Sequence, residues 1–340
     1  MAASETKQAR QMELQTWALA QLKRLDMPVE HPFEISPASD DASFRRYFRG
    51  SVPGQTFIFV DAPPDKEDNA SFVEIDERLG EVGVPVPKVY AKDLKRGFLM
   101  LSDLGDRLLL PELKLADLKG QERWYQIALE TLGVVQRAPV KNLPVYDRSR
   151  LLEEMALFPE WFVTRQLNLM MSAPNRALFS QTAEFLVDEA LRQPTVFVHR
   201  DFHARNLMPQ SDESLGVIDF QDAVLGPVTY DLVSLLKDCY WRLPRSTVET
   251  LVESFRKRTA SQAGEQEFLR WFDLMGFQRH LKCAGIFSRL HLRDGKPGYL
   301  GDIPLVVDYL QEVAGFYEEL SEFGVWLESE IKPAMASTWS

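Results

Sequence analysis

Two apolar runs that each end in polar side chains constrain this chain more than any other feature. The first, Val196 to Asn206 (VFVHRDFHARN), begins as a buried strand and turns directly into a dense polar cluster. The second, Gly216 to Phe220 (GVIDF), is strand-like and carries an acid, Asp219, near its end. If the two strands lie side by side, these ends meet, so we expect a short β element that brings Asp201, Asn206 and Asp219 together.

The residue types and their spacing fit phosphoryl transfer. His199-Arg200-Asp201 is followed, five residues after Asp201, by Asn206, which is the H-R-D-x-x-x-x-N spacing of a kinase catalytic loop. A carboxylate at Asp201 can orient an attacking hydroxyl and accept its proton late. The amide oxygen of Asn206 and the carboxylate of Asp219 are suitable Mg²⁺ ligands. We therefore predict a phosphotransferase with ATP and Mg²⁺ as cofactors, Asp201 as catalytic residue, and Asn206 and Asp219 as metal ligands.

Residues around this loop admit more than one interpretation. We expect His199 to brace the loop by hydrogen bonds rather than to transfer protons. His203 could either support the loop or contact the substrate. Arg205 could either contact phosphate or substrate, or form a solvated ion pair. Asp231 opens a helix, either as an acid favoured by the helix dipole or as an acceptor that orients the loop, and we favour the second. Alone, HRD could be a helix cap or a surface ion pair, and Asp219 a turn residue; together they favour catalysis.

The rest of the pattern predicts an α+β chain in two unequal parts. The first part, residues 1–104, reads as an initial amphipathic helix and several short antiparallel strands around one further helix. Its predicted strands are 43–49, 56–60, 88–91 and 98–101, and its second helix is 69–80. The second part, residues 105–340, is mainly helical, with strands only at 195–198 and 215–218. Its predicted helices are 121–137, 148–157, 175–191, 228–241, 247–259, 268–292 and 306–323.

Composition excludes several classes of protein. The net charge is −11 and no basic stripe is present, which excludes nucleic-acid binding. The first 25 residues lack the apolar core of a secretory signal, and no stretch is long and apolar enough to span a bilayer. The two cysteines, Cys239 and Cys283, lack metal-ligand spacing and are too few for a disulfide framework. We expect a cytoplasmic monomer with reduced core thiols, no membrane partner and a small-molecule substrate.

Six segments resemble the aminoglycoside phosphotransferase/choline kinase superfamily. HRDFHARN is followed by IDFQDA and GPVTYDL, and residues 41–49 (DASFRRYFR), 61–64 (DAPP) and 97–105 (GFLMLSDLG) extend the match into the first part. Within the superfamily, these segments look like the bacterial kinases that phosphorylate the anomeric hydroxyl of N-acetylmuramate or N-acetylglucosamine. The resemblance implies a bilobal protein-kinase-like fold with a small antiparallel-sheet N-lobe (1–104) that binds ATP and a mainly helical C-lobe (105–340) that binds the amino sugar. It also implies a role in the recycling of cell-wall sugars.

The resemblance implies nucleotide contacts in the N-lobe. Leu101 to Leu104, which includes Asp103, matches the interlobe hinge whose backbone meets adenine. The turn 39–43, which ends at Ser43, matches the segment that covers the phosphates. This turn has no glycine, and strand 56–60 lacks the usual phosphate-binding lysine. We hypothesise that Arg45 or Arg46 supplies the charge, and since side chains alternate along a strand, only one should face the nucleotide. The alternative is an exposed strand face.

Several functional alternatives remain open from the sequence. The aromatic segment 158–162, with Trp161, could line the sugar site, although core packing explains such a segment more often. The acceptor could instead be an aminoglycoside, choline or homoserine. A catalytically silent nucleotide-binding module is a third possibility. The missing lysine and the Gln221 that replaces a glycine after Asp219-Phe220 are departures from the kinase pattern, whereas the presence of Asp201, Asn206 and Asp219 opposes a silent module.

Overall fold

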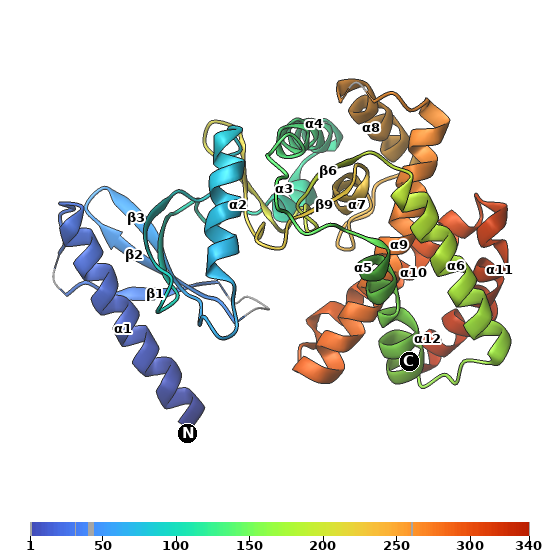
Figure 1. The fold of residues 1–340 in the computed structure, drawn as a ribbon, viewed down its shortest axis with the longest axis horizontal. Helices are drawn as coiled ribbons and strands as arrows, with labels where there is room; N and C mark the ends of the chain where they lie inside the picture. The colour runs from blue at the N-terminus through green and yellow to red at the C-terminus, as the bar shows by residue number, and fades with distance from the viewer. Residues whose placement is uncertain (1, 31, 40–43, 260, 340) are drawn as a thin grey trace. The chain divides into compact units, whose positions relative to one another are not determined.

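The computed structural model describes residues 2–30, 32–39, 44–259 and 261–339 and divides into two compact units (Figure 1). Unit 1 comprises Met1–Leu108 together with Leu207–Asp222, and unit 2 comprises Leu109–Asn206 together with Ala223–Ser340. The chain thus enters unit 1 twice. Asn206 belongs to unit 2 and Asp219 to unit 1. The assignment of nucleotide binding to 1–104 and catalysis to 105–340 stays a prediction.

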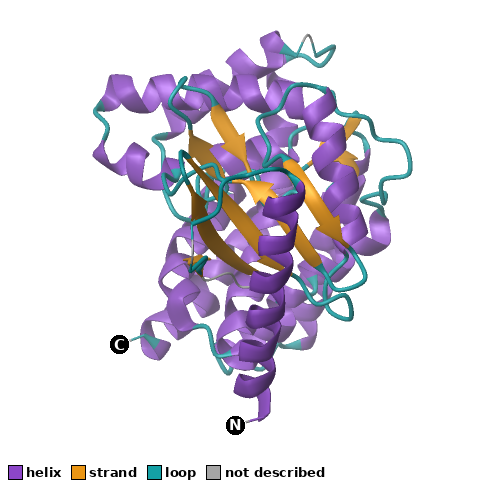
Figure 2. Ribbon diagram, turned by 90° about the vertical axis from the view of Figure 1, so that its left-hand side faces the viewer, coloured by secondary structure: helices purple, strands orange, loops and turns teal. Residues whose placement is uncertain are grey.

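A five-stranded antiparallel sheet forms the centre of unit 1, in the order β1-β2-β3-β5-β4. Its strands are β1 (Ile35–Ser39), β2 (Arg46–Val52), β3 (Gln55–Asp61), β4 (Val89–Asp93) and β5 (Phe98–Ser102). Helix α1 (Ala2–Arg24) lies across one face of the sheet (Figure 2). Trp17 of α1 packs on Phe98, with 5.8 Å between ring centroids, because alternate strand residues point to this face. The predicted hairpin and the antiparallel N-terminal sheet are confirmed.

Helix α2 (Asn69–Glu81) and a hairpin of β7 (Leu207–Pro209) and β8 (Leu215–Val217) complete unit 1. The side chain of Asp68 caps α2 by accepting from two backbone N–H groups of the first turn. The hairpin attaches through the Val217 N–H, which donates to the Pro85 carbonyl at 2.8 Å. Gln210 also donates to the Leu104 carbonyl, at 3.2 Å. The hairpin therefore belongs to the N-terminal sheet unit although it follows Asn206 in the chain.

Unit 2 is mainly helical, and α9 (Glu265–Asp294) runs through it (Figure 1). Helices α5, α6, α7, α8 and α10 and the π-helical segment η1 all contact α9. The helices are α3 (Leu109–Leu115), α4 (Leu118–Val135), α5 (Arg148–Met155), η1 (Phe158–Gln166), α6 (Ala173–Leu191), α7 (Tyr230–Leu236), α8 (Arg245–Arg258), α10 (Ile303–Ala314), α11 (Ser321–Trp326) and α12 (Lys332–Thr338). Shorter segments are η2 (Pro297–Asp302), η3 (Glu318–Leu320) and η4 (Leu327–Ile331). A two-stranded antiparallel pair, β6 (Thr195–Val198) and β9 (Val224–Pro227), carries the polar loop.

Two predicted helices differ from the structure. The helix expected at 306–323 is wrong as one element, because α10 ends at Ala314 and a new helix begins at Ser321. Gly315 follows α10 directly, and glycine is a poor helix former. The helix expected at 228–241 is shorter, since α7 spans Tyr230–Leu236. Both errors lie outside the catalytic loop.

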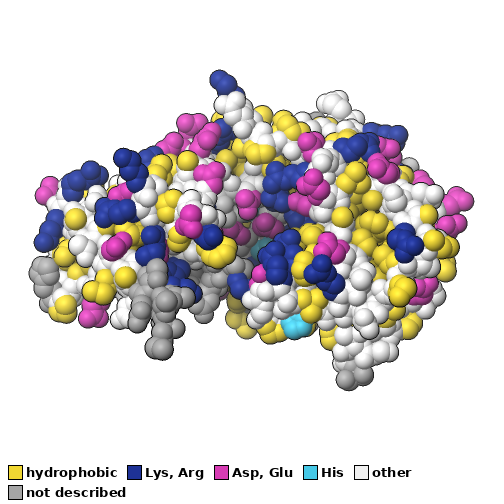
Figure 3. Space-filling view, turned by 60° about the horizontal axis from the view of Figure 1, so that its bottom comes forward, with side chains coloured by type: hydrophobic (Ala, Val, Ile, Leu, Met, Phe, Trp, Pro, Cys, Tyr) yellow, Lys and Arg dark blue, Asp and Glu magenta, His cyan; other side chains and the backbone are white. Residues whose placement is uncertain are grey.

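Surface charge, helix character and the state of the cysteines can be compared with the expectations from the sequence. On the face drawn in Figure 3, Lys and Arg side chains are interspersed with Asp and Glu, and the described residues form no continuous basic stripe there. Among the described helices, none combines the length and the apolar character that crossing a bilayer requires. Cys239 and Cys283 are both buried and free, as expected from the sequence.

Candidate active site

The loop after β6 is fixed to α7 by one buried carboxylate. Asp231, which is 0% exposed, accepts from the His199 N–H at 2.7 Å through Oδ2 and from the Arg200 N–H at 2.9 Å through Oδ1. Arg200 has a left-handed backbone, with φ of 78°, a conformation that needs such support. Burial raises the pKa of Asp231 to about 6. Asp231 thus makes the contacts expected of an acceptor that orients the loop.

Asp201 follows Arg200 in the same loop. Its side chain is 41% exposed, and the Arg279 Nη2 lies 3.8 Å from its Oδ1. Burial acts to raise its pKa, but the charges of Lys282, His203, Arg279 and Arg200 outweigh burial and lower the pKa to about 2. The carboxylate is therefore ionised at neutral pH and available to accept a hydrogen bond.

The loop also closes on itself around Asp201. The Asn206 Nδ2 donates to the Asp201 carbonyl at 3.0 Å, and the His203 N–H donates to the same carbonyl at 3.0 Å. Because the amide nitrogen of Asn206 is turned into the loop, its oxygen is the end that can ligate a cation. His199 is fully buried, and its Nδ1 accepts from the Asp201 N–H at 3.3 Å. His199 therefore braces the loop from within.

Buried cations of α9 lie behind the loop, and the sequence analysis missed them. Arg279 donates to the Ser234 hydroxyl at 2.6 Å and to Cys283 Sγ at 3.1 Å. Lys282 donates to the Tyr230 hydroxyl at 2.9 Å and pairs with Glu154 at 3.4 Å. Glu154 also pairs with Arg200. The available signal was the presence of cations within the long, mostly apolar run 268–292.

His203 and Arg205 meet an aromatic wall. The His203 ring packs edge-on against Tyr240, with 5.4 Å between centroids, and the Arg205 guanidinium stacks 3.8 Å from the same ring. Tyr240 in turn lies beside Phe287, which stacks on Tyr299 at 5.4 Å. Burial lowers the pKa of His203 to about 3, so its imidazole is neutral near pH 7. Such a wall suits contact with a sugar ring.

Trp161 occupies a different position from its aromatic neighbours. Phe158 and Phe162 are both 0% exposed and fill the core, as expected if this segment serves core packing. Trp161 is half-buried and stacks with Arg165, whose guanidinium carbon lies 4.0 Å from the ring centroid. The core role therefore belongs to the two phenylalanines, and Trp161 keeps part of its surface accessible.

In unit 1, Arg45 and Arg46 point to opposite sides of the sheet. Arg46 forms an ion pair with the fully buried Asp61 and donates to the Lys7 carbonyl of α1. Arg45 instead pairs with Glu67 at 3.2 Å and lies 5.5 Å from the ring of Phe72 in α2. The strand alternation is as expected. The arginine on the α2 side is Arg45.

The segment that carries Asp219 is also anchored on α2. Phe220 packs on Phe72 with 5.0 Å between centroids, and the Ser71 hydroxyl donates to the Gln221 carbonyl at 3.0 Å. Asp219 has φ of 66°, and its Oδ1 accepts from the Gln221 amide at 2.8 Å. Phe72 therefore contacts both Phe220 and the guanidinium of Arg45, which places Asp219 and Arg45 along the same helix.

The predicted hinge has specific partners of its own. Leu101 lies in β5, and Asp103 pairs with Arg49, whose Nε donates to Oδ2 at 2.6 Å. The Leu104 carbonyl accepts from Gln210. The Asp103 side chain thus holds Arg49. Ser43, in the predicted phosphate-covering turn, lies outside the described residues.

The metal prediction concerns only two protein ligands. Among residues 2–30, 32–39, 44–259 and 261–339, no three His, Cys, Asp or Glu side chains cluster as a metal site. Mg²⁺ in kinases keeps several waters and takes only one or two protein oxygens besides the phosphates. The hard oxygen donors of Asn206 and Asp219 fit that requirement.

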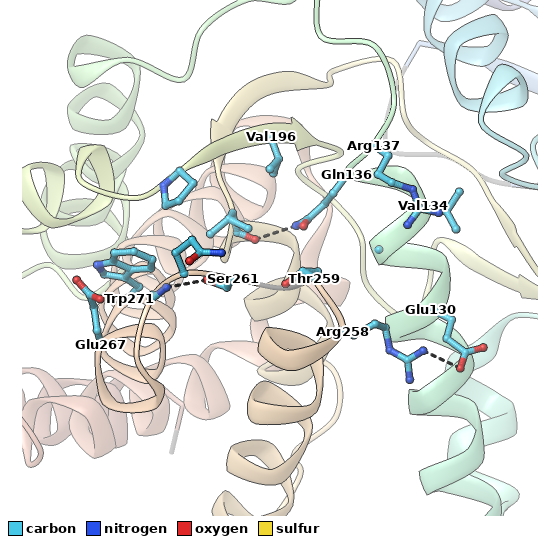
Figure 4. Close-up of a pocket in the computed structure, with 15 residues that line it drawn as sticks. Glu130, Val134, Gln136, Arg137, Val196, Arg258, Thr259, Ser261, Glu267 and Trp271 are labelled. Atoms are coloured by element: carbon cyan, nitrogen blue, oxygen red, sulfur yellow. Dashed lines mark hydrogen bonds and ion pairs between the residues drawn. The ribbon is translucent and has the colours of Figure 1, made fainter.

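A separate cavity of about 840 Å³ opens in unit 2 at the start of β6 (Figure 4). Val196, Val228 and Val134 line it, and Arg258 pairs with Glu130 at 3.0 Å on one side. It contains none of the predicted catalytic residues. It is distinct from the polar loop, which follows the other end of β6.

Known proteins of similar sequence share one family and one name. The profile of the phosphotransferase enzyme family matches residues 34–272. Relatives named N-acetylmuramate/N-acetylglucosamine kinase occur in Pseudomonas putida, at 44% identity over 85% of this chain and 86% of theirs, and in Pseudomonas aeruginosa, at 43% over 88% and 89%. A relative of the same name in Neisseria meningitidis is 40% identical over 92% of this chain and 93% of its own.

Solved structures show the same fold at low sequence identity. An ethanolamine kinase of Plasmodium vivax superposes with a TM-score of 0.62 at 10% identity, covering 81% of each chain. The choline kinase LicA from Streptococcus pneumoniae gives 0.61 at 10% identity, covering 87% of this chain and 98% of its own. The predicted bilobal protein-kinase-like fold class is confirmed.

Proposed function

Because the chain belongs to the phosphotransferase enzyme family, we propose that it transfers the γ-phosphate of ATP to the anomeric hydroxyl of N-acetylmuramate and N-acetylglucosamine. It is a sugar kinase of the kind that its 40–44% identical relatives are named for. The observation that carries the chemistry is the loop geometry. Asp201 is ionised and partly exposed, and Asp231 fixes the two residues before it.

Asp201 is the proposed catalytic residue. Its carboxylate accepts a hydrogen bond from the anomeric hydroxyl and takes the proton as the new oxygen–phosphorus bond forms, while the bond from the γ-phosphorus to the bridging oxygen breaks and ADP leaves. A hemiacetal hydroxyl is more acidic than an ordinary alcohol, so even a weakly basic carboxylate can accept its proton late in the transfer. His199 and Asp231 position the loop, and His203, Arg205 and Trp161 are proposed to contact the sugar.

The nucleotide contacts are proposed from the match to the family's pattern. The backbone of 101–104 would meet adenine, and Ser43 and Arg45 would meet the phosphates. Asn206 and Asp219 would hold Mg²⁺, which neutralises the charge that develops on the transferred phosphoryl group. Arg46 is the less favoured phosphate contact, since it pairs with buried Asp61. We propose a cytoplasmic monomer whose partners are ATP and the amino sugar.

An acceptor panel tests this function. ATP turnover is measured with N-acetylmuramate, N-acetylglucosamine, choline, homoserine and kanamycin, and product NMR identifies the phosphorylated hydroxyl. We expect turnover with the two sugars, phosphate at C1, and loss of turnover in Asp201→Asn. Strong turnover with a cation and none with either sugar would reject the acceptor. Mg-ATP binding without transfer to any acceptor would favour a silent module.

A further inference from the structure

Three cations of α9 share one face of the helix. An α-helix advances about 100° per residue, so Arg279, Lys282 and Arg289 fall within an arc of about 80°. The first two are almost fully buried, at 4% and 6% exposed, and both act on the catalytic loop. Each also has protein partners, since Arg279 donates to Ser234 and Lys282 donates to Tyr230.

Arg289 differs from these two cations because it lacks such partners. It is half-buried, its Nε is buried without a hydrogen bond, and it forms no ion pair within the described part of the chain. The two acidic residues that influence it are engaged elsewhere. Glu160 pairs with Arg165 at 2.9 Å and Asp294 pairs with Arg293 at 2.8 Å. Burial and the neighbouring Arg293 lower the pKa of Arg289, so the protein itself stabilises this charge poorly.

The surroundings of Arg289 include η1, the segment that carries Trp161, one of the predicted sugar contacts. Gly285, one turn earlier, allows close approach of η1, since a Cβ there would lie 2.4 Å from the Leu157 carbonyl carbon. Trp161 follows in η1, next to Glu160, which acts on Arg289. Long side chains on a helix lean toward its N-terminus, which for Arg289 is the direction of Lys282 along α9. Seven residues of helix rise about 10 Å, a span that a substituted monosaccharide can bridge.

We propose that Arg289 binds a carboxylate on the acceptor sugar. The inference rests on the proposed function and adds a determinant of substrate choice. N-acetylmuramate carries a carboxylate on its lactyl ether, and N-acetylglucosamine has a hydroxyl at that position. A guanidinium is the side chain best suited to a carboxylate, because it offers two parallel N–H donors. Arg289 would thus favour the lactyl sugar, while the aromatic wall and Asp201 serve both acceptors.

Steady-state kinetics with three acceptors test this role. The variant Arg289→Met replaces the apolar stem of the side chain with an unbranched one and removes the charge. We expect its KM for N-acetylmuramate to rise about 10- to 100-fold, the loss typical of a charge-assisted contact, while kcat/KM for N-acetylglucosamine changes less than threefold. The methyl ester of N-acetylmuramate lacks the carboxylate charge. The wild type should bind this ester more weakly than the acid, and Arg289→Met should bind the two alike.

Arg293→Met is the matched control, because Arg293 lies one turn further along α9 and is paired with Asp294. It should leave the preference between the sugars unchanged. Equal effects of Arg289→Met on both sugars, or a wild type that does not distinguish the acid from its ester, would overturn the inference while the sugar-kinase function stands. A wild type that phosphorylates neither sugar would reject the proposed function, and the inference with it.

Discussion

Replacing Asp231 with alanine is the most direct test of how the loop is held. The substitution removes both acceptors of the His199 and Arg200 N–H groups, which lie 2.7 and 2.9 Å from the carboxylate. A hydrogen bond to a charged group contributes about 1.5–3 kcal/mol. The carboxylate is itself costly to bury, as its raised pKa indicates, and this offsets part of the loss. We expect Asp231→Ala to lower the free energy of unfolding by about 2–4 kcal/mol.

The same change should affect catalysis more than binding. Without Asp231, Arg200 can leave its left-handed conformation, and Asp201 moves with it. We expect kcat to fall at least about 100-fold, with less than a threefold change in KM for ATP. Asp231→Asn retains one acceptor oxygen, so its kcat should lie between those of the wild type and Asp231→Ala. Urea unfolding followed by circular dichroism gives the stability, and coupled ADP assays at saturating sugar give kcat.

Asp273→Asn serves as the control for structural damage. Asp273 is as deeply buried as Asp231, but it pairs with Arg245 and Lys237, away from the loop. The control should lose stability and keep kcat in the folded fraction. If Asp231→Ala kept kcat within threefold of wild type, or if Asp273→Asn lost as much, the proposed positioning role would be refuted.

Three further changes have defined outcomes. Gly285→Ala would drive a methyl group into the Leu157 backbone, so thermal unfolding should show a loss of about 1–3 kcal/mol, and an unchanged melting temperature would contradict that close approach. Burial lowers the pKa of His280 to about 3, so the unfolded chain binds the proton first, and stability should fall as pH drops below about 6.5. His280→Gln should flatten this acid loss in urea titrations at pH 7 and pH 5; an identical slope would argue against it. Arg45→Ala should raise KM for ATP about 10-fold and Arg46→Ala less than threefold, with the reverse order excluding Arg45 as the phosphate contact.

The sequence predicts those elements whose local pattern and tertiary setting agree. The strand Thr195–Val198 has its predicted bounds, and α2 matches its prediction to within one residue, because an apolar run or a helical face ends there at clear polar or glycine signals. The short strands β7 and β9 were missed, since each ends in a proline, a residue that argues against a strand. Periodicity also continued past Gly315, where the helix ends.

The site could be predicted only to the extent that it is local in sequence. The H-R-D spacing identified the loop, and the helix-opening position of Asp231 suggested its role. The cations of α9 were not predicted, because Arg279 lies far along the chain from Asp201 and only the fold brings its guanidinium within 3.8 Å of Oδ1. Likewise, strand alternation separated Arg45 from Arg46, but only the contacts with Phe72 and Asp61 show which side each occupies.

The return of Leu207–Asp222 to unit 1 has a consequence for biosynthesis. The N-terminal sheet emerges from the ribosome first, yet the hairpin that packs on Pro85 and Leu104 is translated only after most of the first half of unit 2. An isolated fragment that stops at residue 108 would expose the surface this hairpin covers. The N-terminal unit of the nascent chain therefore stays incomplete until residue 222 has left the exit tunnel. During this interval, chaperones could bind the surface that the hairpin later covers.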